Sequence, residues 1–401
     1  MKKTIYFDNA ATTRMDDRVL ETMVPYMKDS FGNANGKYSI GYEARKAVNE
    51  ARKQAAAMLG AEPDEIYFTS GGTEGNNTVI RGFLRNAMLC NDGTAYSSDY
   101  NSRIIISDEF EHDSVLQTLK DVEKNDVKTV MLKTDRAGNI SPKDLEKVLQ
   151  SVFGAKIPAD SEKKILVSIM LVNNETGNIQ PVKELADIAH SYNCLFHTDA
   201  VQASGHMQID VKELGVDFLS ISGHKLYGPK GTGLIYVKRG VKIIPMITGG
   251  GQERGMRSGT ENVPGIAGLG KACELAKQEY EANSRKESEI AGYFKNRLLS
   301  SISGAKLNGD GKWILNFSFS GINGTSLALR LDMEGICVST GSACSAGLDE
   351  RSHVLTALGL PVEQIDSSVR ISIGKYNTIE EAEYTCECIE RLVSELRSLR
   401  V

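Results

Sequence analysis

The feature that most constrains the fold of this chain is an alternation of two kinds of segment over about its first 260 residues. Short runs rich in β-branched and aromatic residues are followed by stretches of helix formers, as at 65–84, 103–119 and 164–193. Parallel strands need a long crossover between them, and a helix of about 10–15 residues supplies it. The alternation therefore predicts an α/β fold with a mainly parallel sheet wrapped by helices.

The pattern changes after about residue 260, where one long helical region covers 265–302. The polar pair Asn283–Ser284 is a place where this helix could break. An alternating strand-like run follows at 314–321, and a last helix begins at Thr378, where Glu381 completes a capping box. These segments predict an α+β arrangement that differs from the first part of the chain.

Length also favours more than one domain, because 401 residues exceed the roughly 100–200 that one domain usually holds. We expect a large α/β domain over 15–260 and a smaller α+β domain formed by 1–14 and 261–401. The polar inserts at 91–102 and 154–164 are expected to be surface excursions.

The composition excludes several kinds of partner and site. With 47 basic and 52 acidic residues the net charge is −5, so neither nucleic acid nor an anionic membrane is expected as the main partner. No stretch reaches the roughly 18 apolar residues of a membrane-spanning helix, and Asp8 and Asn9 interrupt any signal-peptide core. The seven cysteines are scattered, and Cys386 and Cys388 are poorly spaced as joint metal ligands. We therefore expect a cytoplasmic protein without a metal site.

Polar clusters follow several expected strands, at the sheet edge where open parallel sheets bind ligands. TSGGTEG (69–75) offers backbone N–H groups and the Thr73 hydroxyl at a helix start, which suits a phosphate group. HTDAVQ (197–202) brings Asp199 and Gln202 to the same edge. Taken alone, the glycine loop could be structural and Asp199 could merely cap a turn.

Lys225 stands in SGHKLYGPKGTG (222–233), a glycine-rich turn between two strand-like runs. A lysine in a turn is usually a solvated surface group. Here the surrounding turn holds the amine, and removal from water favours the neutral form that attacks an aldehyde. Together with the phosphate loop, the carboxylate of Asp199 and His112 as a group that could stack on a ring, this lysine completes the parts needed to hold pyridoxal phosphate.

A series of motifs covers nearly the whole chain in order, from YFDNAATT at 6–13 to RISIGKYNT at 370–378. Between them lie FTSGGTEGNN, EH at 111–112, NNETGNIQP, HTDAVQ, SGHKLYGPKG, GGGQERGMRSGTEN and STGSACSAG. In this order they resemble the cysteine desulfurases, the NifS/IscS-like members of the fold-type I pyridoxal-phosphate enzymes. The resemblance implies a fold-type I PLP-dependent transferase fold, pyridoxal 5'-phosphate as cofactor, L-cysteine as substrate and L-alanine as product.

The resemblance also implies roles for individual residues. Lys225 would carry the covalent link to the cofactor and move the substrate Cα proton, and Asp199 would keep the ring nitrogen protonated. Gln202 would bond the ring hydroxyl oxygen, and His112 would stack on the ring and is the obvious acid–base partner for the thiol. The other implied cofactor contacts are Gly72, Thr73, Asn174, Ser222, His224 and Thr260.

Two of these assignments concern the substrate and a second subunit. Asn174 and Arg370 would hold the substrate carboxylate, for which a planar guanidinium is well shaped. Without the family context Arg370 would be interpreted as part of a surface ion pair. Thr260 would reach the phosphate of the neighbouring subunit, which implies a homodimer with shared sites.

Cys344 is implied as the nucleophile. It lies in STGSACSAGLDERSHVL (339–355), where small and polar residues surround it, whereas Cys273 and Cys386 stand in apolar periodic sequence. Its thiolate would attack the substrate sulfur, leaving alanine and a persulfide, and the sulfur would pass to an acceptor protein such as an iron–sulfur scaffold, or into tRNA thiolation. Cys337, in a strand-like run, is expected in the core.

Two departures from the family pattern and two alternatives accompany this interpretation. Ala34 stands where the family often has proline and Tyr38 where it has histidine, departures that concern the loop near the active-site mouth and no core catalytic group. A selenocysteine lyase on the same scaffold is the second enzyme hypothesis. A sulfur-relay scaffold without catalysis is disfavoured because Lys225, Asp199 and Cys344 are all present.

Overall fold

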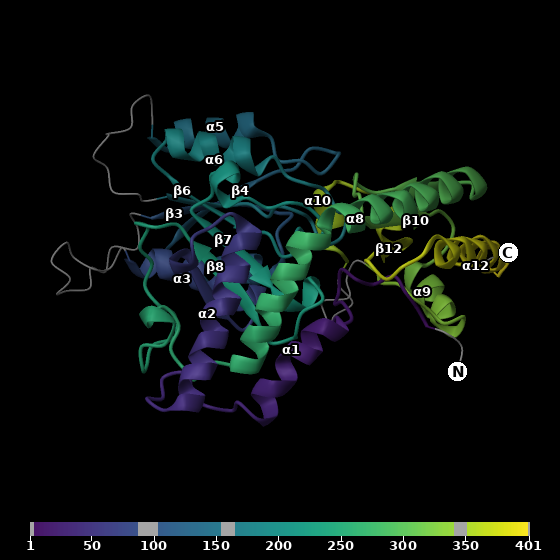
Figure 1. Cartoon of the computed structure of the whole chain (residues 1–401). Coiled ribbons are helices and arrows are strands. Elements are labelled where there is room, and N and C mark those ends of the chain that lie inside the picture. The colour runs from purple at the N-terminus through teal and green to yellow at the C-terminus, as the bar shows by residue number, and fades with distance from the viewer. Residues whose placement is uncertain (1–3, 87–102, 154–164, 341–350, 400–401) are drawn as a thin grey trace.

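Seven strands among the described residues form one sheet in the order β2–β8–β7–β6–β5–β3–β4 (Figure 1). The structure is a computed structural model that describes residues 4–86, 103–153, 165–340 and 351–399. The strands are β2 (Ile66–Thr69), β3 (Ile104–Asp108), β4 (Lys128–Leu132), β5 (Ile165–Ser168), β6 (Leu195–Asp199), β7 (Phe218–Ser222) and β8 (Gly233–Val237). β8 runs antiparallel to both its neighbours, and the other pairings are parallel. The expected α/β fold with a mainly parallel sheet is confirmed.

Helices cover both faces of this sheet. Successive side chains of each strand point to opposite faces, so apolar side chains on both faces need helices to bury them. Ile105 of β3 packs in the apolar cluster of α3 (Gly72–Asn86) and α4 (Asp113–Glu123), whereas Ile106 packs in the opposite cluster. The helices of that opposite cluster are α1 (Asp17–Lys28), α2 (Ser39–Leu59), α5 (Pro142–Phe153), α6 (Val182–Ser191) and the first part of α8 (Val263–Ser301). The connecting helices bring the carboxyl ends of the parallel strands to one edge.

A second, antiparallel sheet of three described strands has its own apolar cluster, to which α9 and α12 contribute. The helix α12 begins with the expected capping box, formed by Thr378 and Glu381. The N-terminal strand β1 pairs with β11 and so joins this part of the molecule. The elements are β1 (Ile5–Tyr6), β9 (Ala305–Leu307), β10 (Ile314–Phe319), α9 (Gly324–Met333), β11 (Ile336–Cys337), β12 (Ser368–Ser372) and α12 (Ile379–Ser398).

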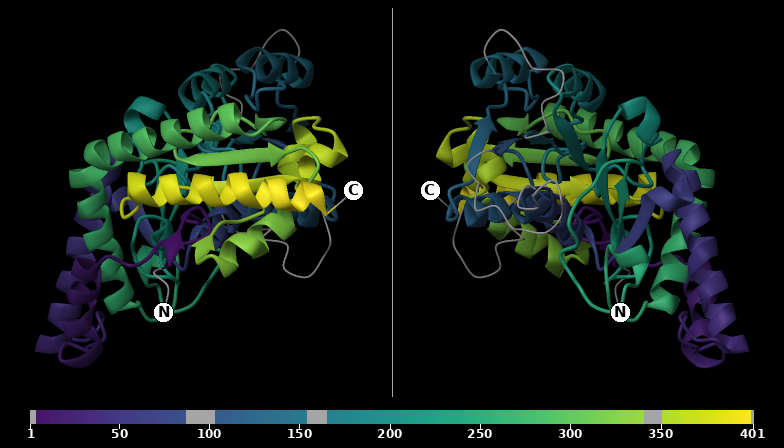
Figure 2. Two further views of the ribbon diagram at one scale, coloured as in Figure 1. Left: turned by 90° about the vertical axis from the view of Figure 1, so that its right-hand side faces the viewer. Right: turned by 90° about the vertical axis from the view of Figure 1, so that its left-hand side faces the viewer.

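The helix α8 is uninterrupted over 39 residues and contributes to both apolar clusters. The break considered at Asn283–Ser284 does not occur. Leu269 packs at one end of the helix and Phe294 at the other, and a polar pair between them costs a helix less than about 0.7 kcal/mol per residue. Figures 1 and 2 show the second part of α8 alongside α12. Because α8 belongs to both clusters, the domain division at 260/261 stays a prediction.

The remaining elements are short. They are α7 (Val211–Leu214), α10 (His353–Ala357), α11 (Val362–Asp366) and 3-10 turns at Pro63–Glu65, Gly223–Lys225 and Glu253–Gly255. In the part of the chain that the structure describes, no helix combines the length and apolar character needed to cross a bilayer. The inserts at 91–102 and 154–164 lie outside the described residues. Cys273 and Cys386 are buried, but Cys337, expected in the core, is only half-buried in the two-stranded β1–β11 ribbon.

Candidate active site

A cavity of about 220 Å³ lies at the carboxyl ends of β6 and β7. Asp199 is the last residue of β6 and Ser222 the last of β7. The cavity is lined by Ala10, Ala11, Gly72, Thr73, His112, Ser114, Met170, Asn174, Asp199, Val201, Gln202, Ser222, His224, Lys225 and Arg370. Of the predicted site residues that the structure describes, all but Thr260 therefore line one cavity.

Lys225 ends the 3-10 turn that follows β7. Its Nζ donates to the carbonyl oxygens of Ala10 and Ala11, the latter at 2.8 Å, so the N-terminal segment holds the amine at the cavity wall. The turn depends on Gly223, where a Cβ would lie 2.6 Å from Thr232 Oγ1. The glycine-rich turn thus aims the lysine into the cavity, as the sequence predicts.

A chain of hydrogen bonds joins Asp199 to His112. Asn76 donates through Nδ2 to Asp199 Oδ2 at 2.7 Å and to Ser114 Oγ at 2.8 Å. Ser114 Oγ lies 2.8 Å from His112 Nδ1, and the Ser114 backbone N–H donates to the same nitrogen at 3.0 Å. The other oxygen of Asp199 accepts from the Val201 N–H at 2.9 Å. These contacts fix the carboxylate and engage Nδ1 of the imidazole, which leaves Nε2 for a ligand.

Burial keeps two histidines of the cavity neutral. Burial lowers the pKa of His112, and the charge of Asp199 opposes this only in part. Because Nδ1 accepts hydrogen bonds, the neutral ring carries its proton on Nε2. Burial also lowers the pKa of His224, to about 4, and its Nδ1 lies 3.1 Å from Thr12 Oγ1. Near pH 7 both rings can therefore bond a ligand without adding positive charge.

The N-terminus of α3 forms one wall of the cavity. Gly72 is the first residue of the helix and packs so closely that a Cβ would lie 2.8 Å from Val201 Cγ2. Thr73 follows it, and Ser222 and His224 line the cavity from the end of β7. Unsatisfied N–H groups at a helix start, next to hydroxyl and imidazole groups, suit a phosphate group.

Arg370 lies in β12 and is only 2% exposed. The alternative interpretation, a surface ion pair, is therefore wrong. Its guanidinium donates to Asp8 Oδ1 at 2.8 Å and to the Asn174 carbonyl oxygen at 2.9 Å. Arg370 Nε and Asn174 Oδ1 are buried and have no hydrogen-bond partner among the residues that the structure describes. Buried polar atoms are rarely left unpaired, so this wall is prepared for a polar ligand.

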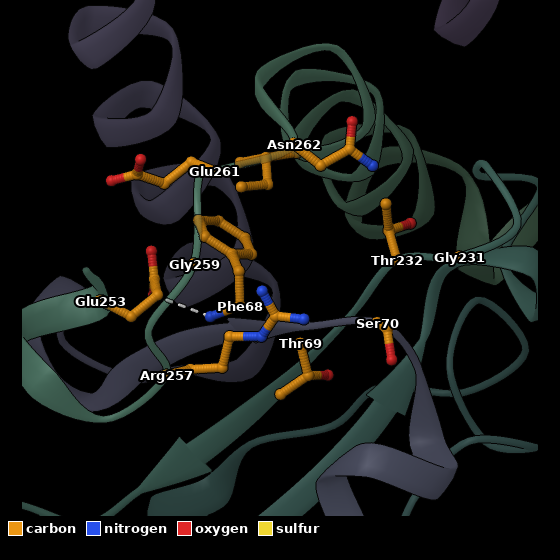
Figure 3. Close-up of a pocket in the computed structure, with 11 residues that line it drawn as sticks. Phe68, Thr69, Ser70, Gly231, Thr232, Glu253, Arg257, Gly259, Glu261 and Asn262 are labelled. Carbon is orange, nitrogen blue, oxygen red and sulfur yellow. Dashed lines mark hydrogen bonds between the residues drawn. The ribbon is translucent and has the colours of Figure 1, made fainter. Parts of the chain in front are cut away.

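Thr260 is the one described site residue predicted from the sequence that does not line the cavity. Cys344 lies outside the described residues, and Thr260 is exposed in a loop whose neighbouring residues line a separate pocket of about 60 Å³ (Figure 3). Glu253 fastens this loop to the edge strand β2, because it accepts from the Phe68 N–H at 2.8 Å and pairs with Arg52 at 2.7 Å. In a single chain Thr260 is therefore held at the surface.

The sequence interpretation missed two groups, Ser114 in the cavity lining and Asn76 buried behind Asp199. Asn76 belongs to the quoted motif FTSGGTEGNN, and its position four residues after Gly72 places both on one face of α3. Ser114 lies two residues after His112, and its backbone N–H donates to the histidine ring. This short spacing is the local feature that could have pointed to Ser114. Together with the helix terminus, the aimed amine and the orphaned Asn174 Oδ1, these groups fit a ligand with a phosphate, an aldehyde and a ring nitrogen, as pyridoxal phosphate has.

Comparisons with known proteins identify the family. The model of the family "Aminotransferase class-V" matches residues 5–384. A cysteine desulfurase IscS from Dictyoglomus turgidum is 43% identical over 403 residues, covering 100% of this chain and 97% of that protein. The solved structure of a NifS-like protein has a TM-score of 0.86 at 36% identity, covering 98% of this chain and 100% of its own.

A structure of SspA in complex with cysteine is also similar, with a TM-score of 0.77 at 32% identity over 94% of this chain and 100% of that one. The matches to sequence and to structure span nearly the whole chain and agree on one group of enzymes. This chain belongs to the aminotransferase class-V family and, within it, to the NifS/IscS-like cysteine desulfurases.

Proposed function

We propose that this protein converts L-cysteine to L-alanine and transfers the sulfur atom to Cys344 as a persulfide. The substrate C–S bond breaks, a sulfur–sulfur bond to Cys344 forms, and the former methylene carbon takes up a proton. The change consumes no external oxidant or reductant. The observation that carries the proposal is the cavity that combines Lys225, Asp199, His112 and Arg370 at one sheet edge.

The groups of the cavity support pyridoxal 5'-phosphate as the cofactor. When bound, it supplies a ring that accepts the electron pair left as the substrate Cα loses its proton. Lys225 would hold its aldehyde carbon, Asp199 would keep its ring nitrogen protonated, and Gln202 and His112 would contact the ring. The phosphate contacts would come from Gly72, Thr73, Ser222, His224 and, across the dimer, Thr260.

Three side chains would act on the substrate itself. The Lys225 amine would take up the Cα proton, oriented by the carbonyls to which it donates. Neutral His112 carries its proton on Nε2 and would act there as the proton donor of the sulfur-transfer step. Arg370 would bind the substrate carboxylate beside Asn174, because its guanidinium is already fixed by Asp8 and keeps its Nε–H without a partner among the described residues.

We also propose a homodimer in which Thr260 completes the partner's phosphate site. The exposed apolar side chains of Phe31 and Tyr42, at 71% and 63% exposure, stand on the segment that contains Asn35. Asn35 donates to the Glu261 carboxylate at 3.2 Å, so this apolar surface lies beside the Thr260 loop. A second copy of the chain that packed against these side chains would remove them from water.

The sulfur would then leave for an acceptor protein, such as a scaffold for iron–sulfur cluster assembly, or for tRNA thiolation. We expect the protein to work in the cytoplasm. The free thiols of Cys273, Cys337, Cys386 and Cys388 support a reducing compartment.

Borohydride reduction of the purified holoenzyme, followed by peptide mapping, tests the assignment. We expect the reduced adduct on Lys225. Lys225→Ala should form no alanine, whereas Lys230→Ala, which changes an exposed lysine of the same turn, should keep full activity. Cys344→Ala should keep the cofactor absorption and form no persulfide.

An adduct on another lysine, or full desulfuration by Cys344→Ala, would overturn the proposal. Parallel assays with L-cysteine and L-selenocysteine separate it from a selenocysteine lyase, because release of selenide alone would favour the lyase.

A further inference from the structure

The described residues on both sides of the segment that carries Cys344 are tied to the walls of the active site. On the N-terminal side Ser339 pairs with Arg370: the Ser339 N–H donates to the Arg370 carbonyl at 3.1 Å, and the Arg370 N–H donates back at 2.6 Å. The segment 341–350 itself lies outside the described residues. Ser339, two residues before this segment, is thus paired through its backbone with the buried arginine that lines the cavity.

On the C-terminal side the fastening is made by Ser352. Its hydroxyl donates to Glu175 Oε2 at 2.5 Å and accepts from the Leu355 N–H at 3.0 Å, which caps the short helix α10. Ser352 and Glu175 are only 5% and 4% exposed. Glu175 directly follows Asn174, so this hydrogen bond links the start of α10 to the loop that lines the cavity.

His353 makes a second link, to the loop that carries His112. Its Nε2 donates to the carbonyl oxygen of Glu111 at 2.9 Å, and Glu111 directly precedes His112. The contact is backed by an apolar cluster in which Phe110, from the same loop, packs against α10 and α11. The cluster consists of Phe110, Val354, Leu355, Leu358 and Ile365.

A purely structural role explains the apolar cluster but not the buried acid. Burying a carboxylate costs free energy, and an apolar residue of similar volume is often at least as stabilising. Burial raises the pKa of Glu175, and the hydrogen bond from Ser352 and the charges of His353 and Arg370 oppose this. A hydrogen-bonded acid between Asn174 and the start of α10 defines a position more narrowly than apolar packing does.

We propose that Ser352, Glu175 and His353 are positioning residues for sulfur transfer. They fix the point at which the Cys344 segment rejoins the fold, relative to His112 and Asn174. They therefore act in persulfide formation and not in removal of the substrate Cα proton. The inference rests on the proposed function, in which Cys344 accepts the sulfur.

Two measurements on the holoenzyme separate these steps. Exchange of the Cα hydrogen of L-alanine with solvent deuterium requires Lys225 but no thiol. Single-turnover formation of persulfide from L-cysteine requires Cys344 as well. The variants are Ser352→Ala, which removes the donor; Glu175→Leu, which removes the acceptor; and Glu175→Gln, whose amide oxygen can still accept. Asn323→Ala removes the exposed cap of α9 and controls for the loss of a helix cap.

We expect Ser352→Ala and Glu175→Leu each to slow persulfide formation by roughly tenfold or more, equivalent to about 1.4 kcal/mol. Alanine exchange should stay within about twofold of wild type in both, a difference of less than half a kcal/mol. Glu175→Gln should retain most of the persulfide rate, and Asn323→Ala should leave both measurements unchanged.

Unchanged persulfide formation in Ser352→Ala and Glu175→Leu would overturn the inference. An equal loss of both measurements in these variants would overturn it too, because it would mean general damage to the site. Failure of the proposed function is distinguishable, since the wild-type enzyme would then exchange the Cα hydrogen of L-alanine without forming a persulfide on Cys344.

Discussion

At the scale of single residues, burial decides which groups carry charge. His197 in β6 is fully buried, with Nδ1 2.9 Å from Ser168 Oγ and Nε2 3.1 Å from Ser220 Oγ. Burial lowers its pKa to about 3, so the ring is neutral in the folded protein throughout the physiological range. The unfolded chain, by contrast, takes up a proton as the pH falls through about 6.5.

This difference predicts acid sensitivity. Stability is fully present above pH 6.5 and falls as the pH drops toward 3, because only the unfolded state binds the proton in that window. Between pH 7.5 and 5.0 His197 should account for a loss of up to about 2 kcal/mol. His197→Gln, which cannot be protonated, should show a smaller shift of the urea midpoint between these two pH values. An identical shift in both proteins would contradict the prediction.

The buried pair of Arg52 and Glu253 predicts a large stability effect. Its side chains are only 9% and 4% exposed, and Glu253 also accepts from the Phe68 N–H. Glu253→Leu should lower the free energy of unfolding by about 3–5 kcal/mol, because it leaves a buried guanidinium without its counter-charge. Arg239→Ala, which removes an exposed pair, is the control and should change the thermal midpoint little. Comparable shifts in both variants would contradict this account.

At the scale of elements, the start of α3 depends on close packing against the loop after β6. Gly72→Ala should weaken cofactor binding by roughly tenfold or more, about 1.4 kcal/mol, because the new Cβ would meet Val201 Cγ2 at 2.8 Å and displace the helix terminus. Titration of the apoenzyme with pyridoxal phosphate, followed by absorption, measures this. Gly292→Ala in α8 meets no atom within 4 Å and is the matched control. It should raise stability by about 0.5–1 kcal/mol and leave cofactor affinity unchanged.

Elements with local signals were predictable. α2 ends at Leu59 and is capped by Gly60, whose φ of 67° is a left-handed conformation that glycine adopts without strain. α12 begins with the expected capping box at Thr378. The break considered at Asn283–Ser284 was wrong because packing at the two ends of α8 outweighs a weak local preference. Tertiary contacts, not propensity, set the length of this helix.

At the scale of the whole molecule, the N-terminal segment connects distant parts of the chain. Asp8 holds Arg370 of the second sheet, Thr13 accepts from the Tyr227 N–H and donates to the His224 carbonyl, and Asp16 pairs with Lys375. The active site is therefore built between the two sheets, and the proposed dimer would add Thr260 to it from a second copy.

Mixed dimers test this arrangement. In a dimer of one Lys225→Ala chain and one Thr260→Asp chain, both defects fall in one site if Thr260 serves the partner, and the other site is intact. We expect the mixed dimer to recover about half of the wild-type activity. The Lys225→Ala homodimer should be inactive because it lacks the amine, and the Thr260→Asp homodimer should be weak because the new carboxylate repels the phosphate. If Thr260 serves its own chain, both sites are defective and mixing should recover nothing.

The sequence by itself determined the features that neighbouring residues control. These are the alternation of strands and helices, the helix caps, and the turn that aims Lys225, because turn chemistry and side-chain periodicity act over a few residues. Ordered motifs also named most of the polar residues that line the cavity.

Only the tertiary structure decided which of these groups meet. Arg370 is buried against Asp8, 362 residues away, and Asn76 bonds Asp199, 123 residues away. No local pattern encodes such pairs, because they follow from how the crossovers and the N-terminal segment pack. Burial, which sets the protonation of His112, is likewise a property of the assembled fold.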